Sequence, residues 1–474
     1  MKQFDIAIIG GGPGGYVAAI KAAQAGKKVC LVEKDKLGGV CLNRGCIPTK
    51  TMLKSIAVLN TLRESGEFGI IGADITKAAI DIKKLLQRKS EVVKKLTGGV
   101  GMLLKANGVT IYKAAATFVD KNTLDLGAEQ VKADNIIIAT GSVPVKLPIP
   151  ISGAETCPCH VPCTSRDACT PLITSDEALE LTEIPATMVV IGGGVIGIEF
   201  AYVYANLGTK VTVIEVMDRI LPMVDEEITT DVGKMLTKLN INIMTNSKVT
   251  RIEGAKVYFE SGGKEQCAEA SKILMSVGRA PSTEGLNIEA LGLTMDRRAI
   301  TTDEHMKTNI PGIYAIGDVN GKSMLAHTAS MEGIVAVENI LGHQAKMYYD
   351  KIPSCIYTHP EIASVGLTEK QAIEKYGKDK VKIGKFPFAA NGKATVEGES
   401  KGMIKVIVDS EFGEILGAHL YGIHATDMIA EVVLAMNLES TAEEISLVVH
   451  AHPTVSEVIP EAFHAALGKA IHSI

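Results

Sequence analysis

Hydrophobic and polar positions near the start of the chain follow a strand, turn and helix order. An apolar run at 5–9 leads into the glycine-rich stretch 10–15, and a helix-like run of small and apolar residues covers 16–25. The apolar run 28–33 then predicts a second strand. This pattern is typical of a β–α–β unit on a buried parallel sheet.

The same order recurs at 188–215, again as strand, glycine turn, helix and strand. Both units contain a G-x-G-x-x-G fingerprint, and an acid, Glu33 or Glu215, lies 23 positions after the first glycine of each. Such glycines permit a tight turn close to a pyrophosphate, and the acid accepts hydrogen bonds from a ribose hydroxyl. The duplication predicts an α/β fold with two Rossmann-like domains, each holding one dinucleotide.

The rest of the pattern predicts helices at 90–105 and 327–341, an antiparallel excursion at 109–131, and strands at 136–141 and 313–318. A proline-rich connector at 144–150 marks the first domain boundary. From about 351 onwards strands and helices alternate without a phosphate-binding loop, which indicates an α+β domain with another role. We expect the first nucleotide-binding domain at 1–150, the second at 151–280, a return to the first at 281–350, and the C-terminal domain at 351–474.

Composition narrows the class of ligand. The 474 residues are 46% apolar and 22% charged, which is ordinary for a soluble globular protein. A net charge of −5 gives no broad basic field, so we expect no nucleic acid partner. The longest apolar run, 188–200, is interrupted by glycines and too short to span a membrane. Because the chain passes from Met1 almost directly into an apolar strand, we expect a cytoplasmic protein without a targeting segment.

Two cysteines lie just beyond the first fingerprint, in the stretch 38–50. Cys41 and Cys46 are five positions apart, a spacing that by itself fits two buried cysteines as well as a redox pair. A disulfide in a cytoplasmic chain is more often catalytic than structural. Their place beside a dinucleotide site favours a disulfide next to a flavin, because electron transfer needs sulfur held at a fixed position beside the ring.

Four segments together resemble the pyridine nucleotide-disulfide oxidoreductases. They are the CLNRGC stretch at 41–46, the second fingerprint, the Ala-Ile-Gly-Asp strand at 315–318 and the HAHPTVSE stretch at 450–457. The resemblance covers almost the whole chain and is closest to the members that oxidise dihydrolipoamide. It implies FAD in the first site, NAD in the second, and a homodimer formed through the C-terminal domain.

The function that this resemblance implies is FAD-dependent oxidation of protein-bound dihydrolipoamide to lipoamide, with reduction of NAD to NADH. The implied partner is the lipoyl-bearing protein of a 2-oxo acid dehydrogenase or glycine cleavage system. Since the first predicted strand begins almost at once, we expect the lipoyl group to come from another protein. The resemblance further implies an active site shared between the two subunits.

The resemblance also assigns roles to the residues of the reaction. Cys41 and Cys46 begin as a disulfide; Cys41 forms the mixed disulfide with substrate, and Cys46 passes electrons to the flavin. His452 is the base that the substrate thiols require, which suits an imidazole because it exchanges a proton near neutral pH. Glu457 resembles the partner that orients this imidazole.

Other residues of the resemblance surround the cofactors. Lys50, one helical turn after Cys46, is expected at the flavin ring, with Glu199 as its partner. Asp318 is expected to bind the ribityl chain of FAD. The remaining cofactor-binding residues expected are Gly10, Gly12, Gly14, Gly15, Glu33, Lys34, Gly39, Val40, Ala115, Ala139, Thr140, Gly141, Met324, Leu325, Ala326, His327, Gly192, Gly194, Gly197, Glu215, Val249, Gly278 and Arg279.

Glu215 predicts the choice of pyridine nucleotide. A carboxylate at this position favours the free 2′-hydroxyl of NAD and repels the 2′-phosphate of NADP. The next residues, Val216 to Asp218, provide no basic cluster for a phosphate. The sequence therefore predicts NAD.

One segment departs from the family pattern. Cys157, Cys159, Cys163 and Cys169 lie with His160 in an insertion near 156–170. Thiolates and imidazole select zinc or iron–sulfur clusters, but this spacing matches no known motif. A metal site, an auxiliary thiol or disulfide relay, and a loop without essential chemistry all remain open.

Other functions are also compatible with parts of the sequence. One is a flavin-dependent reductase of another disulfide or of a metal ion, although the C-terminal residues 468–474 lack the paired cysteines expected for mercuric reduction. Another is a scaffold or metal-sensing component acting through the Cys157–Cys169 loop.

His450 is outside the predicted catalytic set, because it either lines the pocket or packs at the interface.

Overall fold

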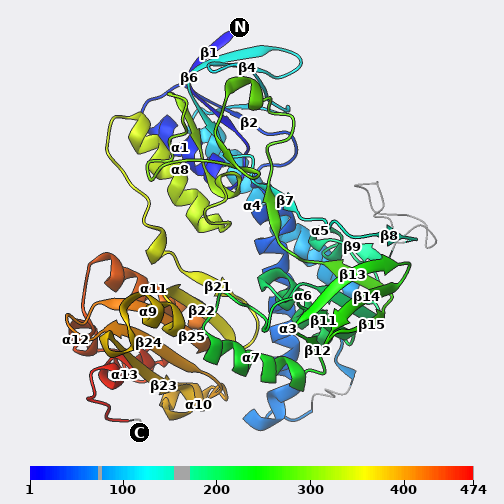
Figure 1. The fold of residues 1–474 in the computed structure, drawn as a ribbon, viewed down its shortest axis with the longest axis vertical. Coiled ribbons are helices and arrows are strands. Elements are labelled where there is room, and N and C mark those ends of the chain that lie inside the picture. The colour runs from blue at the N-terminus through cyan, green and yellow to red at the C-terminus, as the bar shows by residue number, and fades with distance from the viewer. Residues whose placement is uncertain (73–76, 154–170, 473–474) are drawn as a thin grey trace.

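The computed structural model of the chain describes residues 1–72, 77–153 and 171–472. Its elements form three groups (Figure 1). The first group combines blue and yellow-green segments from distant parts of the sequence, the second is mainly green, and the third is the orange and red C-terminal part. None of the described helices is long and apolar enough to cross a membrane.

The first group contains the first predicted nucleotide-binding sheet. Strand β1 (Lys2–Ile9) pairs in parallel with β2 (Val29–Val32) and β6 (Gln130–Ile138), while β3 (Thr110–Tyr112) and β20 (Ile313–Ala315) extend the sheet on either side. The second halves of β1 and β6 are apolar because both faces of the sheet are covered there. One face packs on helical residues such as Ala18 and Val335, and the other packs on non-helical residues such as Leu286 and Ile300. The predicted excursion is real but smaller than expected, since only β4 (Thr117–Asp120) and β5 (Thr123–Asp125) are antiparallel additions to β6.

Two helices from opposite ends of this region pack closely on each other. Helix α1 (Pro13–Gln24) follows the first fingerprint, and α8 (Ala326–Ile340) follows β20 by eleven positions. Their backbones meet at Gly14 and Gly333, where a Cβ on Gly333 would lie 2.7 Å from the Gly14 carbonyl oxygen. This contact brings the start of α8 to the first glycine turn.

The second group contains the second predicted sheet. Strand β10 (Thr187–Ile191) pairs in parallel with β11 (Lys210–Ile214) and β16 (Lys272–Met275), and β12 (Asn242–Met244) and β9 (Leu172–Ile173) complete the sheet. Helices α6 (Val195–Asn206) and α7 (Glu226–Lys238) belong to the same group. A separate antiparallel sheet, not predicted from the sequence, is formed by β13 (Ser247–Glu253), β14 (Lys256–Ser261), β15 (Lys264–Glu269) and, in parallel with β13, β8 (Ile151–Ser152).

Helices after the first fingerprint connect the two sheets. Helix α2 (Gly39–Arg44) is followed at once by α3 (Cys46–Glu64), and α4 (Ile82–Ala106) runs back, starting earlier than the predicted 90–105. The apolar face of α3, with Met52 and Ile56, shares one core with Ile198 and Phe200 of α6. This packing fixes the start of α3 against the second nucleotide-binding unit.

The C-terminal group is a five-stranded antiparallel sheet covered by helices. Its order is β21 (Ser354–Ile356), β22 (Glu361–Gly366), β25 (Ile415–Gly422), β24 (Met403–Asp409) and β23 (Val381–Pro387). The helices of this group are α9 (Glu369–Tyr376), α10 (Gly392–Val396), α11 (Ala425–Asn437), α12 (Ala442–Ser446) and α13 (Val458–Ala466). Short elements elsewhere are β7 (Ser142–Pro144), α5 (Ser175–Ala178), β17 (Arg279–Pro281), β18 (Met295–Asp296), β19 (Ala299–Ile300), and the 3₁₀ helices η1 (Ser65–Phe68), η4 (Gly317–Asn320) and η8 (Val455–Glu457).

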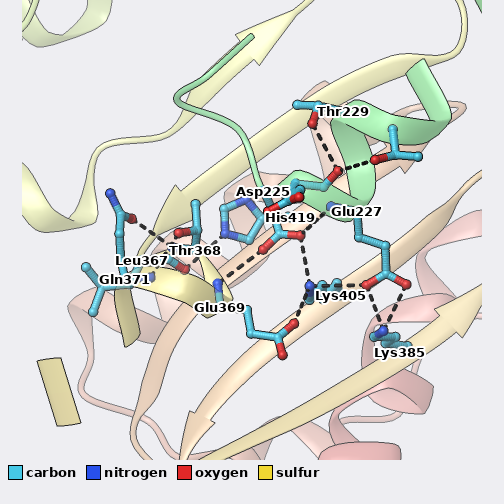
Figure 2. Close-up of polar contacts among 12 residues, drawn as sticks. Asp225, Glu227, Thr229, Leu367, Thr368, Glu369, Gln371, Lys385, Lys405 and His419 are labelled. Carbon is cyan, nitrogen blue, oxygen red and sulfur yellow. Dashed lines mark hydrogen bonds and ion pairs between the residues drawn. The ribbon is translucent and has the colours of Figure 1, made fainter. Parts of the chain in front are cut away.

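A buried ion cluster joins the second and third groups (Figure 2). Lys405 of β24, whose side chain is 2% exposed, places its Nζ 2.8 Å from Asp225, 3.1 Å from Glu227 and 2.6 Å from Glu369. Asp225 also caps α7 by accepting from the Glu227 backbone N–H, and it accepts from the Glu369 N–H at the start of α9. Buried charges require such compensation, so the cluster fixes how the two groups meet. His419 of β25 lies beside it.

Candidate active site

The two glycine fingerprints form equivalent turns. A Cβ on Gly15 would overlap the carbonyl oxygen of Gly10, and a Cβ on Gly197 would overlap that of Gly192. Gly10 and Gly192 themselves have positive φ, 107° and 104°, which favours glycine at the first position of each turn. Both turns therefore bring the helix N-terminus against its strand, where backbone N–H groups face a bound pyrophosphate.

The acids that follow the fingerprints also have equivalent contacts. Glu33 accepts from the backbone N–H of Gly11 at 2.7 Å and of Asp35 at 2.7 Å. Glu215 accepts from the N–H of Gly193 at 2.5 Å and of Met217 at 2.7 Å. Each carboxylate is thus held at the end of its second strand, where a ribose would lie, and it remains an acceptor for hydroxyl groups.

One cavity of about 2210 Å³ extends from the first fingerprint to the second. Most of the predicted site residues line it, including both cysteines and the residues around them. These are Gly10, Gly12, Gly14, Glu33, Lys34, Gly39, Val40, Cys41, Cys46, Lys50, Ala115, Ala139, Thr140, Gly141, Gly192, Gly194, Glu199, Glu215, Val249, Gly278, Arg279, Asp318, Met324, Leu325, Ala326 and His327. The cavity is large enough for dinucleotides, and its two ends have the same turn chemistry.

Four predicted residues do not line the cavity. Gly15 and Gly197 lie behind it, where they let the helices approach the sheets. His452 and Glu457 lie elsewhere, in the C-terminal group. Within one chain the predicted base is therefore separate from the predicted disulfide cysteines.

Cys41 and Cys46 lie close enough for a hydrogen bond between their sulfur atoms and are not joined by a disulfide in this structure. Cys41 belongs to α2, and Cys46 is the first residue of α3. A hydrogen bond from Cys41, supported by the positive charge of Lys50, lowers the pKa of Cys46 to about 7. The same hydrogen bond, together with burial, raises the pKa of Cys41. Cys46 is therefore the sulfur that carries the thiolate charge.

Lys50 and Glu199 form a partly buried ion pair at the cavity wall. The Nζ atom of Lys50 lies 2.8 and 2.7 Å from the two carboxylate oxygens of Glu199, whose side chain is 5% exposed. Glu199 also accepts from the backbone N–H of Tyr357 at 3.0 Å, and the Lys50 ammonium lies 4.5 Å from the centre of the Tyr357 ring. Tyr357 is not predicted from the sequence, because no local motif marks it.

Asp318 is connected to Arg279 through Ser142, which is also not predicted from the sequence. The Ser142 hydroxyl donates to the Asp318 carboxylate and accepts from Arg279 Nε at 2.7 Å. Arg279 Nη2 also donates to the Ser142 carbonyl oxygen at 2.8 Å. Arg279 is therefore tied to the aspartate predicted for the flavin side. The position of Ser142, directly after the Thr140–Gly141 turn, was the available signal.

His452 lies on an exposed segment of the C-terminal group. Its side chain is 79% exposed, and Nδ1 lies 2.9 Å from Glu457 Oε1. The other oxygen of Glu457 accepts from the Thr454 backbone N–H at 2.9 Å. Burial alone would raise the pKa of Glu457, but these hydrogen bonds and the nearby His452 and His450 charges lower it. The ionised carboxylate takes the Nδ1–H, which leaves Nε2 of His452 able to accept a proton.

The cysteine-rich insertion with Cys157, Cys159, Cys163 and Cys169 lies outside the described residues. Among the residues that are described, no group of three or more His, Cys, Asp or Glu side chains is arranged to hold a metal ion.

Comparisons with known proteins cover the whole of this arrangement. The chain matches the family profile described as pyridine nucleotide-disulphide oxidoreductase over residues 4–333, and the dimerisation domain of that family over 352–463. A dihydrolipoyl dehydrogenase of Bacillus subtilis is 40% identical over 99% of this chain and 100% of its own length, and one of Geobacillus stearothermophilus is 43% identical over 100% and 98%. A solved structure, a Cu(II) complex of the HOCl-induced flavoprotein disulfide reductase RclA from Escherichia coli, has a TM-score of 0.83 and 28% identity over 98% of this chain and 99% of that one. The matched ranges include the cavity lining and the segment with His452.

Proposed function

The chain belongs to the pyridine nucleotide-disulphide oxidoreductase family, and we propose that it catalyses the dihydrolipoyl dehydrogenase reaction. Dihydrolipoamide is oxidised to lipoamide, NAD is reduced to NADH, and FAD is the intermediate carrier. The observation that carries the proposal is the single cavity with a fingerprint at either end and Cys41 and Cys46 on its wall. Such a cavity brings a dithiol, a flavin and a nicotinamide within one electron-transfer path.

The residues of the chain fit both cofactors. The first and last glycine of each fingerprint leave no room for a Cβ atom, so the backbone can approach a pyrophosphate closely. Each acid accepts from two backbone N–H groups and lies beside the expected ribose. No basic cluster follows Glu215, so the second site suits NAD rather than NADP. When bound, FAD supplies the two-electron acceptor that the dithiol itself lacks, and it passes a hydride to NAD.

The chemistry of the thiols follows from the chain's own residues. Nε2 of His452 removes a proton from one substrate thiol, and the resulting thiolate attacks Cys41 Sγ of the oxidised pair. The Cys41–Cys46 bond breaks, and Cys46 leaves as a thiolate, which the nearby positive charge of Lys50 favours.

The second half of the exchange releases the product. His452 first gives the proton of the first thiol to solvent. The remaining substrate thiol then loses its proton to His452 and attacks the substrate sulfur of the mixed disulfide, so that lipoamide forms and Cys41 leaves as a thiolate that takes this proton from His452. The protein then holds the two electrons as the Cys41 thiol and the Cys46 thiolate. The net change is dihydrolipoamide plus NAD⁺ to lipoamide plus NADH and one proton.

We further propose that the site is completed across a homodimer. His452 is exposed and does not line the cavity of its own chain, whereas the cysteines do. A dimer formed through the C-terminal domain places the His452 of one subunit at the cysteines of the other. The proposed boundaries are 1–150 and 281–350 for the FAD domain, 151–280 for the NAD domain and 351–474 for the interface. The proposed partner is the lipoyl-bearing protein of a larger enzyme complex, and the proposed location is the cytoplasm.

A reductase of another disulfide or of a metal ion is the competing function. It is less well supported, because the dihydrolipoyl dehydrogenases are 40–43% identical to this chain and the flavoprotein disulfide reductase is 28% identical. Purified protein should show a bound flavin whose absorbance is bleached by dihydrolipoamide and restored by NAD. Glutathione disulfide or a metal ion with NADH is the comparison substrate, and Cys41→Ser is the inactive control. Turnover of the comparison substrate without oxidation of dihydrolipoamide would overturn the proposal.

A further inference from the structure

The segment that carries His452 has little packing of its own. Residues 447–454 lie between α12 and η8 without regular structure. Val449 is 95% exposed, and the His452 side chain is 79% exposed. In the proposed dimer the exposed side of this segment faces the partner subunit. Because proton transfer loses efficiency steeply when the base is misplaced, the contacts of the segment within its own chain should matter for the rate.

Other parts of the domain hold this segment at Thr454, whose carbonyl oxygen accepts from Asn391 Nδ2 at 3.1 Å, and at His450. The His450 side chain is 8% exposed, and its Nε2 lies 2.8 Å from Glu431 Oε1, on the neighbouring helix α11. Its Nδ1 lies 3.0 Å from the carbonyl oxygen of Val448. The His450 ring therefore contacts the backbone of its own segment at Val448 and also contacts helix α11 at Glu431.

Both ring nitrogens of His450 face acceptors. A carboxylate oxygen and a backbone carbonyl oxygen can only accept, whereas a neutral imidazole has a single N–H to donate. The ring satisfies both contacts only as the doubly protonated cation. Removal of the Glu431 charge would leave the buried His450 ring without its partner, which is unfavourable.

The pair is connected to the proposed base through one short stretch of backbone. Thr454 donates its hydroxyl to the Ala451 carbonyl oxygen at 2.7 Å, and its backbone N–H holds Glu457. The positive charge of His450 also helps to lower the pKa of Glu457, the partner of His452. A shift of His450 would therefore move the backbone next to His452. It would also favour protonation of the Glu457 carboxylate, which orients the His452 ring.

We propose that His450 and Glu431 form a positioning ion pair that holds the His452 segment in place for proton transfer with the substrate thiols. This inference depends on the proposed function. The pair touches neither substrate nor cofactor in this scheme, so it acts through His452 alone.

The test uses the flavin-bound full-length protein with Glu431→Gln, His450→Gln and the double variant. The first assay measures kcat for dihydrolipoamide with NAD. The second measures NADH-driven reduction of a dye, which uses both cofactor sites but not His452. The matched control is His472→Gln, which breaks another histidine–glutamate contact, 2.7 Å to Glu461, in the same domain.

We expect kcat for dihydrolipoamide to fall about 10-fold to 100-fold in each single variant, while the dye assay and the KM for NAD stay within about twofold. The double variant should be no worse than the more affected single variant, because the two residues act as one unit. Glu431→Asp should recover part of the lost rate. His472→Gln should behave as wild type.

Two results would overturn the inference alone: an unchanged kcat in both single variants, or equal losses in the two assays, which would indicate general destabilisation. Inactivity of the wild-type protein towards dihydrolipoamide would instead overturn the proposed function, and the inference with it.

Discussion

The ammonium of Lys50 lies 2.8 and 2.7 Å from the two carboxylate oxygens of Glu199, 149 positions away in the sequence. Lys50 belongs to α3, which begins at Cys46, and Glu199 belongs to α6 of the second nucleotide-binding unit. The pair therefore crosses between the two units at the point where electrons would pass from sulfur to flavin. Its low exposure strengthens the electrostatic attraction between the two groups.

Removal of the Lys50 charge should raise the pKa of Cys46, because that charge helps to lower it to about 7. Lys50→Met should reduce the thiolate fraction at neutral pH and slow turnover about 10-fold or more. The pH dependence of Cys46 alkylation in the reduced protein, followed by mass spectrometry, measures the shift. Lys50→Arg keeps the charge and is the matched control. An identical titration midpoint in Lys50→Met would contradict this electrostatic role.

Mixed dimers test the shared site. Cys46→Ser and His452→Gln should each be inactive as homodimers, since each removes a group that every site needs. After unfolding and refolding together, random pairing gives about half mixed dimers with one intact site each, so roughly a quarter of wild-type activity should return. The dihydrolipoamide assay measures this recovery. If the two proteins stay inactive after mixing, each chain must use its own His452.

Glu33 and Glu215 should differ in the cofactor that they serve, although their backbone contacts match. Glu215→Gln should raise the KM for NAD about 10-fold, because an amide cannot accept both backbone N–H groups and a ribose hydroxyl. Glu33→Gln should leave that KM unchanged and lower the flavin content of the purified protein. Absorbance of released flavin per chain and NAD-dependent kinetics separate the two effects. An exchange of the two phenotypes would reverse the assignment of the sites.

His419 should make the protein sensitive to mild acid. Burial lowers its pKa below the ordinary 6.5, and its Nε2 donates to the Leu367 carbonyl oxygen at 3.0 Å. As pH falls below 6.5, His419 is protonated in the unfolded chain but stays neutral in the folded chain. The stability contributed by His419 is therefore fully present above pH 6.5 and is lost as pH falls towards the folded pKa. The loss from this one group should reach about 1.4 kcal/mol per pH unit.

His419→Gln should remove this slope between pH 7.5 and 5.5, because a glutamine amide can still donate to Leu367. Asp225 and Glu227 act with the same sign, but their stabilisation is lost only below their ordinary pKa values of 3.8 and 4.5. Denaturant unfolding at constant protein concentration measures the slope. His424→Asn, at an exposed left-handed position that asparagine also adopts, is the control. A slope that persists in His419→Gln would exclude this histidine as its cause.

The local parts of the fold were predictable, and the contacts between distant segments were not. Both β–α–β units follow from apolar periodicity and glycine spacing, which are properties of adjacent residues. The antiparallel strands around Lys264–Glu269 could not be predicted, because that strand is polar and mostly exposed.

The site was predictable only where it matched a family motif. Cys41, Cys46 and His452 were found in this way, whereas Ser142 and Tyr357 take part through contacts with Arg279 and Glu199 that no motif records. Such contacts depend on how separate elements pack, which a single sequence does not show.

Because the two turns are equivalent, each nucleotide-binding unit of this chain can serve as the control for substitutions made in the other. Positions 10, 15 and 33 of the first unit correspond to 192, 197 and 215 of the second, a constant offset of 182. The offset also relates Gly11 and Asp35, which donate to Glu33, to Gly193 and Met217, which donate to Glu215. A substitution that changes nucleotide preference in one unit can therefore be transplanted to the matching position of the other. A difference between the two outcomes would show how much of the nucleotide preference depends on the turn itself and how much depends on the residues around it.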